Sequence, residues 1–488
     1  MTDPYDFLPY TEHAYAESHP DRLRVVAALS GFAGPTTLTP RILELGCGRG
    51  GNLLPLAASW PEATFVGIDR SAVQIKDATR VQEAAELSNV RFVAGDFTEP
   101  GSEPGAFDFI LCHGVFSWVP PVSRLALLER IASSLSPPGI AYVSWNVLPG
   151  WYERLAARDW MRHAAQASFR EGPKEALRWL REAVPADQTS YRSQLGAVGK
   201  RLGETDAAYL AHEYLAEEHH PLHVKAFLDE TERAGLTYLG DALPRETALE
   251  LLPDGVAERA RPLPLGDALT IADFARNTAF RRTLLVRSDT ARAAGFRAPW
   301  ELDPRALVGV RIASRLVPRG REEAAELETF DGPGATLTLD GLAAKALRAL
   351  ASVAPRGLAC GDLARALGAP EELLARDLFD VWLACPDLDL HYREPDFVSA
   401  VSERPRACPV ARWHATLGSP VTNVWLEEVA LPDLAVRFVL SCLDGRTTEA
   451  ELARRLSLQG RGQVTETDAL LVVRASLAAL AKAALLVG

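Results

Sequence analysis

The chain has 488 residues, of which 48% are hydrophobic and 24% are charged, and its formal net charge is −12 at pH 7. This length predicts about three or four domains, and the composition is typical of a soluble globular protein. The acidic balance argues against a dedicated nucleic-acid or anionic-membrane binder, because such proteins carry basic surfaces. The six cysteines are scattered, without a Cys-x-x-Cys pair, which favours a reducing compartment and predicts no zinc site.

Neither end of the chain predicts a membrane segment. Residues 1–6 are acidic and lack an apolar core, so we expect no signal peptide. The apolar tract at 469–487 is interrupted by Arg474 and Lys482, which is typical of an amphipathic core helix. We therefore expect a cytoplasmic protein that does not contact a membrane.

Residues 1–40 are rich in tyrosine, histidine and proline, with a helix predicted at 21–29. One interpretation is a loosely packed arm. The other is a lid that closes over a ligand and contributes aromatic rings such as Tyr10 and Tyr15. We favour the lid, because polar aromatic side chains are costly to scatter in a linker.

Residues 41–69 carry a nucleotide-binding pattern. An apolar strand at 42–45 runs into a glycine-rich turn, the turn opens a helix at 52–59, and a second strand at 64–68 ends on Asp69. Glycines let the backbone pass close to a ligand, and an acidic residue at this position can accept hydrogen bonds from both ribose hydroxyls. The pattern predicts the first half of a nucleotide-binding α/β sheet.

The glycine turn fits two cofactor templates. Gly46, Gly48 and Gly51 satisfy the dinucleotide template G-x-G-x-x-G. Gly50 in place of Gly51 satisfies E-x-G-x-G-x-G, the form that binds S-adenosylmethionine (SAM), with Glu44 in the leading position. SAM has no pyrophosphate to seat on a helix N-terminus but does have an ammonium and a sulfonium. An acidic Glu44 beside the turn therefore favours SAM.

The next strands support the same choice. A third strand at 89–95 ends on Asp96 and Phe97, a carboxylate and a ring that suit the amine and the face of an adenine. A fourth strand at 107–112 ends at His113, and a helix at 127–135 precedes a fifth strand at 140–144. This order resembles a class I SAM-dependent methyltransferase. An NAD-dependent oxidoreductase is the disfavoured alternative.

The remainder of the chain changes pattern twice. Helical spacing dominates residues 151–290, and a tract rich in Pro, Gly and charge begins at 291. Two segments of three helices each follow, and both resemble small winged-helix units. Their third helices carry few basic residues, namely Arg376 in one and Arg474 and Lys482 in the other, which favours protein contact over DNA contact.

The predicted fold is α/β, with a doubly wound, Rossmann-like methyltransferase sheet followed by a helical domain and two winged-helix-like domains. The predicted boundaries are 1–40 for the N-terminal arm or lid, 41–150 for the SAM-binding domain, 151–290 for a helical regulatory or dimerisation domain, 291–400 for a middle winged-helix-like domain and 401–488 for a C-terminal one.

Further segments strengthen the resemblance. They lie at 19–23, 112–120, 145–151, 212–215 and 421–423, and together they resemble bacterial class I methyltransferases that carry a methyltransferase regulatory domain. That group includes lysine methyltransferases of rickettsial outer-membrane proteins. The resemblance covers most of the chain and implies SAM as cofactor, S-adenosylhomocysteine (SAH) as product and a possible homodimer. Trp145 departs from the tyrosine usual in the family, and if that tyrosine's hydroxyl orients the acceptor, we expect a different acceptor or efficiency here.

Two sets of site residues follow. The predicted cofactor-binding residues are Glu44, Gly46, Cys47, Gly48, Gly50, Asn52, Asp69, Arg70, Asp96, Phe97 and His113, and Glu12 is a second candidate for the SAM ammonium. Cys47 is expected to be a small packing residue rather than a nucleophile. The predicted catalytic residues are His113, Trp118, Trp145 and Tyr15. No metal ligand is predicted.

The leading hypothesis is N-methylation of lysine side chains in a protein or large peptide. An aromatic pocket would lower the pKa of the acceptor amine, and ring faces tolerate a cation. His113 would accept a proton or hold the amine. One alternative keeps the chemistry but transfers the methyl group to a small molecule or biosynthetic peptide. Another is a SAM-sensing regulator whose winged helices bind DNA and which has lost catalysis.

Overall fold

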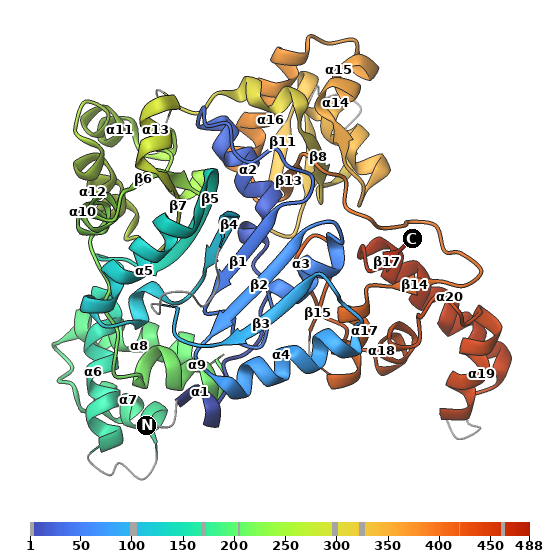
Figure 1. The fold of residues 1–488 in the computed structure, drawn as a ribbon, viewed down its shortest axis with the longest axis horizontal. Helices are drawn as coiled ribbons and strands as arrows, with labels where there is room; N and C mark the ends of the chain where they lie inside the picture. The colour runs from blue at the N-terminus through green and yellow to red at the C-terminus, as the bar shows by residue number, and fades with distance from the viewer. Residues whose placement is uncertain are drawn as a thin grey trace.

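The computed structural model describes residues 4–97, 105–166, 172–203, 205–294, 301–321, 327–418, 420–459 and 464–488. A sheet of seven strands lies at the centre, in the order β3-β2-β1-β4-β5-β7-β6, with helices packed around it (Figure 1). No helix in these ranges is both long enough and apolar enough to cross a membrane.

The first five strands of the sheet are parallel. They are β1 (Arg41–Leu45), β2 (Thr64–Asp69), β3 (Val90–Ala94), β4 (Phe107–Cys112) and β5 (Leu135–Asn146), connected through α3 (Leu53–Ser59), α4 (Ala72–Ala84), η2 (Phe116–Trp118) and α5 (Pro121–Ser134). Their apolar residues are buried because helices cover both faces of a parallel sheet. The five predicted strands are confirmed, and β5 begins earlier than expected.

The sheet continues beyond residue 150, because two later strands join it. β6 (Leu236–Asp241) and β7 (Phe280–Arg287) extend it with antiparallel pairs, β7 against β5 and β6 against β7. The helical pattern expected through 290 stops with α12 (Leu265–Arg276), where Asn277 adopts a left-handed conformation with φ of 52°. Leu284, Leu285 and Val286 are all buried. A short strand that is buried on both faces is a continuous apolar run, so its sequence lacks the alternation of apolar and polar residues that indicates a strand.

A helical region lies between β5 and β6. It contains α6 (Tyr152–Gln166), α7 (Pro173–Ala183), α8 (Thr189–Gly203), α9 (Ala207–Tyr209), the π-helical segment η3 (Leu210–Leu215) and α10 (Val224–Arg233). Between β6 and β7 come η4 (Pro244–Glu246), η5 (Leu249–Leu251), α11 (Asp254–Ala260) and α12. Met161, Leu177, Leu195 and Tyr214 form a separate small core that holds α6 to η3 together.

Two further units follow α13 (Ser288–Ala294). The first contains η6 (Pro304–Gly309), α14 (Gly341–Val353), α15 (Cys360–Leu367), α16 (Glu371–Ala384), a sheet of β8 (Arg311–Ser314), β12 (Leu358–Ala359) and β13 (Leu388–His391), and a sheet of β9 (Val317–Arg321), β10 (Glu328–Asp331) and β11 (Thr336–Leu339). The second contains β14 (Arg406–Ala407), α17 (Pro409–Leu417), β15 (Val421–Thr422), β16 (Glu428–Val429), α18 (Leu434–Ser441), α19 (Glu449–Gln459), α20 (Glu466–Lys482) and β17 (Leu486–Val487).

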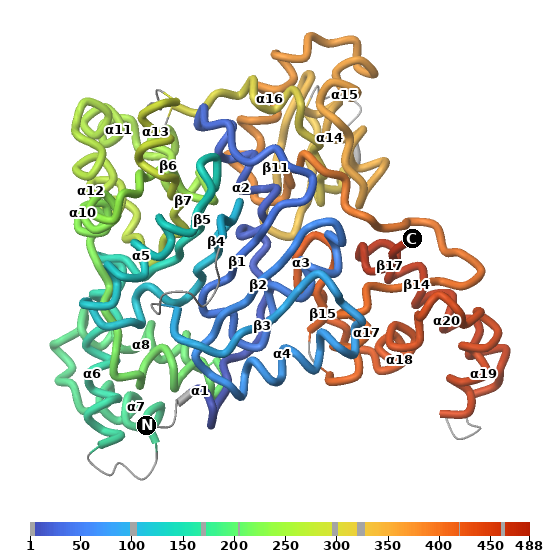
Figure 2. Tube along the Cα trace, viewed as in Figure 1, coloured from blue at the N-terminus to red at the C-terminus, as the bar shows by residue number. Residues whose placement is uncertain are grey.

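The N-terminal segment consists of α1 (Pro4–Phe7), η1 (Ala16–Ser18) and α2 (Pro20–Leu29), which confirms the predicted helix at 21–29. Figure 2 shows this segment in dark blue, running from α1 beside the helical region up to α2 at the middle unit. Arg22 forms an ion pair of 2.9 Å with Asp389, and the Asp21 carboxylate accepts hydrogen bonds from the backbone of Tyr392 and Arg393. These contacts hold the C-terminal end of the segment against the middle unit.

Candidate active site

A cavity of about 570 Å³ lies where the parallel strands end. The loops after β1, β2, β3 and β4 form one part of its wall, and the end of β5 adds Asn146. Residues of the N-terminal segment and of the helical region form the rest. Such a volume is typical of small-molecule sites, and the carboxyl edge of an α/β sheet is where they occur.

The turn after β1 needs its glycines for two different reasons. Gly46, Gly48 and Gly50 have φ of 75°, 53° and 81°, a region that side chains rarely adopt. Gly51 instead makes room for the arm, since a Cβ there would lie 2.9 Å from the Cβ of Glu12. Gly46, Gly48 and Gly51 line the cavity, whereas Gly50 packs against Phe92 and Leu54. Gly50 therefore shapes the turn and does not reach the cavity.

Glu44 is a buried carboxylate with one unsatisfied atom. Its Oε1 accepts a hydrogen bond of 2.9 Å from Asn52 Nδ2, but its Oε2 is buried without a hydrogen-bond partner. Burial, and to a lesser degree the negative charge of Asp69, raise the pKa of Glu44 to about 8. A buried carboxylate oxygen that faces a cavity in this way can be satisfied by a cation.

The second and third strands end on the expected acids. The Asp69 carboxylate accepts hydrogen bonds of 2.9 Å from the backbone N–H groups of Gly48 and Ser71. These bonds fix its orientation. Asp69, Arg70, Asp96 and Phe97 all line the cavity. The arrangement can hold a ribose at Asp69 and an adenine at Asp96 and Phe97.

The N-terminal segment closes over this wall. Asn52 accepts a hydrogen bond of 3.0 Å from the backbone N–H of Tyr15, and Ser71 donates one of 2.6 Å to Asp6. Tyr5, Tyr10, Glu12 and Tyr15 line the cavity. Glu12 forms an ion pair of 3.1 Å with Arg49 on the glycine turn. The segment therefore contributes side chains to the cavity, as a lid does.

His113 lies between two tyrosines. Its ring stacks on Tyr15 with centroids 3.5 Å apart, and its Nδ1 is 2.9 Å from the hydroxyl oxygen of Tyr142. Burial lowers the pKa of His113 to about 3. The ring is thus neutral at physiological pH and a weak base, so its contribution to the site is positional.

An aromatic group lines one part of the cavity. Trp118 and Trp151 both contact His219, with ring centroids 4.6 and 4.1 Å apart, and His219 lies 3.1 Å from the side-chain amide of Asn146. Trp118, Asn146 and Trp151 line the cavity. The expected position of Trp118 at the site is therefore found.

Trp145 was expected at the site, but the structure places it elsewhere. It is 1% exposed, it stacks on Phe227 at 4.3 Å, and its indole N–H donates to Thr283 Oγ1 at 3.1 Å. The reason is geometric: successive side chains of a strand point to opposite faces. Its neighbour Asn146 reaches the cavity instead.

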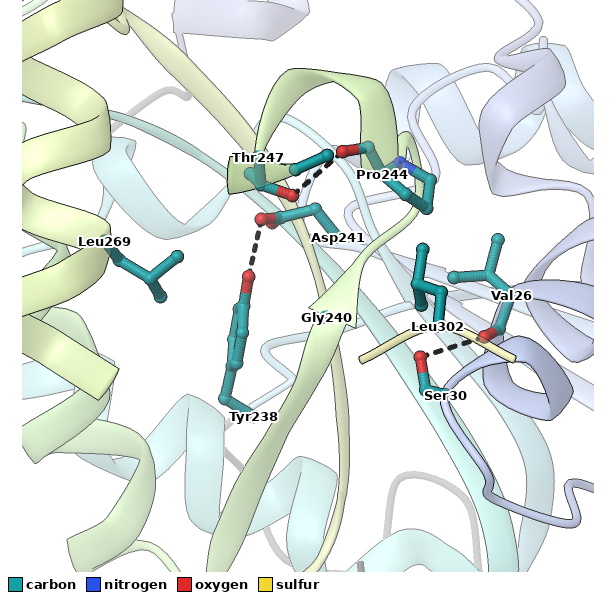
Figure 3. A pocket seen from close by; sticks show the side chains of 10 residues that line it. Val26, Ser30, Tyr238, Gly240, Asp241, Pro244, Thr247, Leu269 and Leu302 are labelled. Carbon is teal, nitrogen blue, oxygen red and sulfur yellow. Dashed lines mark hydrogen bonds between the residues drawn. The ribbon is translucent and has the colours of Figure 1, made fainter. Parts of the chain in front are cut away.

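Thr283 connects Trp145 to a buried charged network. Thr283 and Tyr238 both donate to Asp241, and Arg281 forms ion pairs with Asp241 and Asp273. Figure 3 shows Tyr238 and Asp241 beside a second, small cavity at β6, lined also by Val26 and Ser30. That cavity measures about 20 Å³, enough for one water molecule and too small for a cofactor.

Several residues that line the cavity were not predicted. They are Tyr209, His212 and Glu213 from α9 and η3, Arg154 from α6, and Phe280 from β7. In the sequence, His212 and Glu213 belong to the segment 212–215, which resembles the family but predicts no role for either residue. No local pattern marks them, because the fold brings them to the sheet from more than 60 residues away.

Cysteines and metal ligands contribute no further chemistry in the described ranges. Burial raises the pKa of the Cys112 thiol to about 12 and raises that of Cys47 as well, so both behave as packing residues. Within these ranges no group of three or more His, Cys, Asp or Glu side chains is placed to hold a metal ion.

The cavity fits SAM by its donor set. The unsatisfied Glu44 Oε2 suits an ammonium, the fixed Asp69 suits a ribose, and the turn at Gly46 leaves no room for a side chain, since a Cβ there would lie 2.3 Å from Val115. A parallel sheet with these strand-end acids defines a class I SAM-dependent methyltransferase.

Comparisons with known proteins agree with this class. Residues 42–139 match a family described as a methyltransferase domain, residues 206–287 one described as a predicted methyltransferase regulatory domain, and residues 403–469 one described as a PKMT C-terminal winged helix domain. The chain belongs to the class I methyltransferases that carry this regulatory domain.

Two relatives come from Rickettsia prowazekii. The uncharacterized protein RP028 is 31% identical over 235 residues, which cover 47% of this chain and 94% of that protein. The uncharacterized protein RP789 is 34% identical over 293 residues, which cover 59% of this chain and 53% of its own length. The structure of PKMT2 from Rickettsia typhi in complex with AdoHcy superposes with a TM-score of 0.85 at 22% identity, over 98% of this chain and 100% of that one. The two chains therefore share their fold almost from end to end.

Proposed function

We propose that the protein transfers the methyl group of SAM to lysine side chains of a protein or large peptide. The observation that carries this proposal is the composition of the cavity. Beyond the nucleotide-binding loops it continues into a region lined by Tyr10, Trp118, Trp151 and Tyr209, with one carboxylate, Glu213. Ring faces and a carboxylate are the groups that bind a cationic amine.

The cofactor residues take separate roles in this proposal. Glu44 and Glu12 lie at the ammonium of SAM, Asp69 binds the ribose, and Asp96 with Phe97 binds the adenine. Gly46, Gly48 and the other turn residues Cys47 and Asn52 shape the pocket around it. SAM supplies an activated methyl group on a good leaving group, so the protein has mainly to align the acceptor and deprotonate it.

The acceptor residues orient and desolvate the amine. A lysine ammonium with a pKa of ~10.4 is mostly charged at neutral pH and has no lone pair to attack with. Transfer into the aromatic region lowers that pKa, because burial disfavours the charged form. Tyr15 and His113 form a stacked pair that gives this region a fixed wall. The fold shared with PKMT2 along the whole chain supports a protein as acceptor.

Labelled SAM tests the proposal. The purified protein is incubated with methyl-labelled SAM and a cell lysate, in one sample desalted and in the other intact, and the label is followed into protein and small molecules. We expect the label in the protein fraction of both samples. Label only in the small molecules of the intact lysate would overturn the protein acceptor and leave a small-molecule methyltransferase.

A further inference from the structure

We infer that Glu213 binds the acceptor's ammonium group inside the cavity and takes its proton before methyl transfer. This inference rests on the proposed function, since it requires a cationic amine as acceptor. It assigns the base of the reaction to the helical region and not to the loops that follow the strands.

The local fold points Glu213 into the cavity. Glu213 lies in the π-helical segment η3 (Leu210–Leu215), and single π turns inside helices occur frequently at functional sites. The neighbouring His212 fixes the segment: its Nε2 is 2.6 Å from the carbonyl oxygen of Leu8, and its ring stacks on Tyr5 with centroids 4.2 Å apart. Glu213 lines the same cavity as Glu44, so the proposed cofactor carboxylate and the proposed base face one cavity.

The surroundings of Glu213 are aromatic. Tyr10 donates its hydroxyl proton to Glu213 Oε1 at 3.5 Å, and Tyr15 and Tyr209 line the cavity with it. In the described part of the chain Glu213 forms no ion pair within 4.0 Å, whereas Glu12 in the same cavity is paired with Arg49. A long weak bond to Tyr10 leaves the carboxylate with lone pairs for an incoming ammonium, and the rings offer their negative faces to the same cation.

The electrostatics of Glu213 suit a base that works near neutral pH. Its enclosure raises its pKa to about 7, against the opposing effect of Arg154, of the Tyr10 hydrogen bond and of Arg158. A catalytic base is most effective when its pKa lies near the working pH. His113, the other titratable candidate, has its pKa lowered to about 3, so it binds a proton far more weakly.

Proton transfer precedes methyl transfer. The acceptor ammonium gives one proton to the Glu213 carboxylate, which leaves a neutral amine and a carboxylic acid. The nitrogen lone pair then forms the new N–C bond while the C–S bond breaks, and the sulfur keeps that electron pair, so the products are a methylammonium and neutral SAH. Glu213 afterwards releases its proton to water through the cavity. No oxidant, reductant or metal takes part.

Three variants test the inference. Glu213→Gln keeps the shape and removes the charge. Tyr10→Phe removes the hydrogen bond but keeps the ring, and Glu217→Gln is the matched control on an exposed neighbour outside the cavity. For each variant we would measure SAH affinity by calorimetry, methyl-lysine formation in protein substrate between pH 5.5 and 9, and competition by n-butylammonium against uncharged n-pentanol.

The expected results differ between variants. Glu213→Gln should bind SAH as the parent does, while kcat/KM for lysine falls about 10- to 100-fold, the range for a lost hydrogen bond to a charged group, and the preference for n-butylammonium over n-pentanol disappears. The activity of the parent should decrease below pH 7 as Glu213 becomes protonated. Glu213→Gln should lack this acid limb of the pH profile. Tyr10→Phe should move the acid limb of the activity profile to higher pH, because the hydrogen bond that it removes favours the ionised form of Glu213. Glu217→Gln should match the parent.

Two failures can be told apart. If the parent forms no methyl-lysine at all, the proposed function is wrong and this inference falls with it. If the parent forms methyl-lysine but Glu213→Gln keeps the same kcat/KM and the same acid limb, the inference alone is overturned. Unchanged SAH affinity in Glu213→Gln separates either result from a failure to fold.

Discussion

At the scale of single residues, Glu44 shows how the site is prepared for a cation. Its carboxylate is buried, Asn52 satisfies one of its oxygens, and the other has no partner in the described protein. Without a ligand, ionisation of this group destabilises the fold, since a buried charge without a counter-ion loses its hydration, and burial raises the pKa of Glu44 for that reason. The same feature becomes favourable when an ammonium enters.

The first prediction concerns the pH dependence of stability at Glu44. Its folded pKa of about 8 lies above the ordinary value of 4.5, so its contribution is fully present below pH 4.5 and is lost as the pH rises through 8. The ligand-free parent should lose on the order of 1.4 kcal/mol of unfolding free energy for each pH unit in that window. Glu44→Gln should not show this loss. Denaturant unfolding between pH 5 and 9 measures the difference, and parallel curves for both proteins would contradict it.

Substitutions of Trp145 and Trp118 should have different effects. The first should lower the stability of the protein, and the second should lower its turnover. Trp145→Phe removes a buried N–H donor to Thr283 and leaves a small void, so we expect a loss of about 1–3 kcal/mol of unfolding free energy and unchanged SAH affinity. Trp118→Phe should instead lower the turnover of acceptor with little change in stability, because this ring lines the cavity. Chemical denaturation and kcat/KM measure both effects. Lost turnover at normal stability in Trp145→Phe would place Trp145 in the acceptor site after all.

The sequence predicted the part of the cavity wall that follows the parallel strands well, and the rest of the wall poorly. Glu44, Asp69 and Asp96 follow strands in a local pattern, and all three reach the cavity. Trp145 and Asn146 are adjacent, and only strand register decides which of them faces the site. Glu213 was missed for a different reason, since a π turn depends on tertiary contacts that no helical periodicity indicates.

At the scale of elements, the position of the N-terminal segment depends on the glycine turn, because the segment passes close to Gly51. The backbone of His13 passes 3.0 Å from where a Gly51 Cβ would lie, and Glu12 passes at 2.9 Å. Because backbone atoms cannot move aside as a flexible side chain does, any side chain at position 51 must displace the segment.

Gly51→Ala tests this dependence. We expect SAH affinity to fall several-fold and proteolysis within residues 8–18 to become faster, since the segment can no longer close on the turn. Gly199→Ala in α8 is the matched control, because nothing lies within 4 Å of its added methyl group. The control should be neutral or more stable by roughly 0.5–1 kcal/mol. Equal proteolysis of the two variants would show that the segment does not rest on Gly51.

The strands differ in how far their sequences reveal them. β1 to β5 are apolar runs bounded by turns, and their order along the chain follows the known βαβ pattern, which made them predictable. β6 and β7 follow helices that look like a separate domain, and nothing local shows that they pair with β5. A sheet completed by distant antiparallel strands requires knowledge of the tertiary fold.

At the scale of the whole molecule, the C-terminal unit holds the N-terminal segment over the cavity. His13 Nδ1 lies 2.7 Å from Glu428, and His414 Nε2 lies 3.5 Å from a carboxylate oxygen of Glu12. These contacts join residues about 400 positions apart, so the sequence could not reveal them. They connect the C-terminal unit to the N-terminal segment.

This connection predicts a pH effect on the lid. The hydrogen bond to Glu428 raises the pKa of His13 above 6.5, and Asp206 and Glu12 also face the ring and act in the same direction. The stabilisation of the closed segment is therefore present below pH 6.5 and is lost as the pH rises through the raised pKa. Proteolysis of the segment should be faster at pH 8.5 than at pH 6. Glu428→Gln should reduce this difference, and an unchanged difference would rule out the His13–Glu428 contact as its cause.

We propose that one cavity binds SAM and a lysine side chain together. The most direct measurement is acid hydrolysis of the protein fraction after reaction with methyl-labelled SAM, followed by identification of the labelled amino acid. We expect labelled methyl-lysine with the parent and with Glu217→Gln, and about 10- to 100-fold less with Glu213→Gln. Label on any other amino acid, or no label in protein while SAH still binds, would contradict the claim.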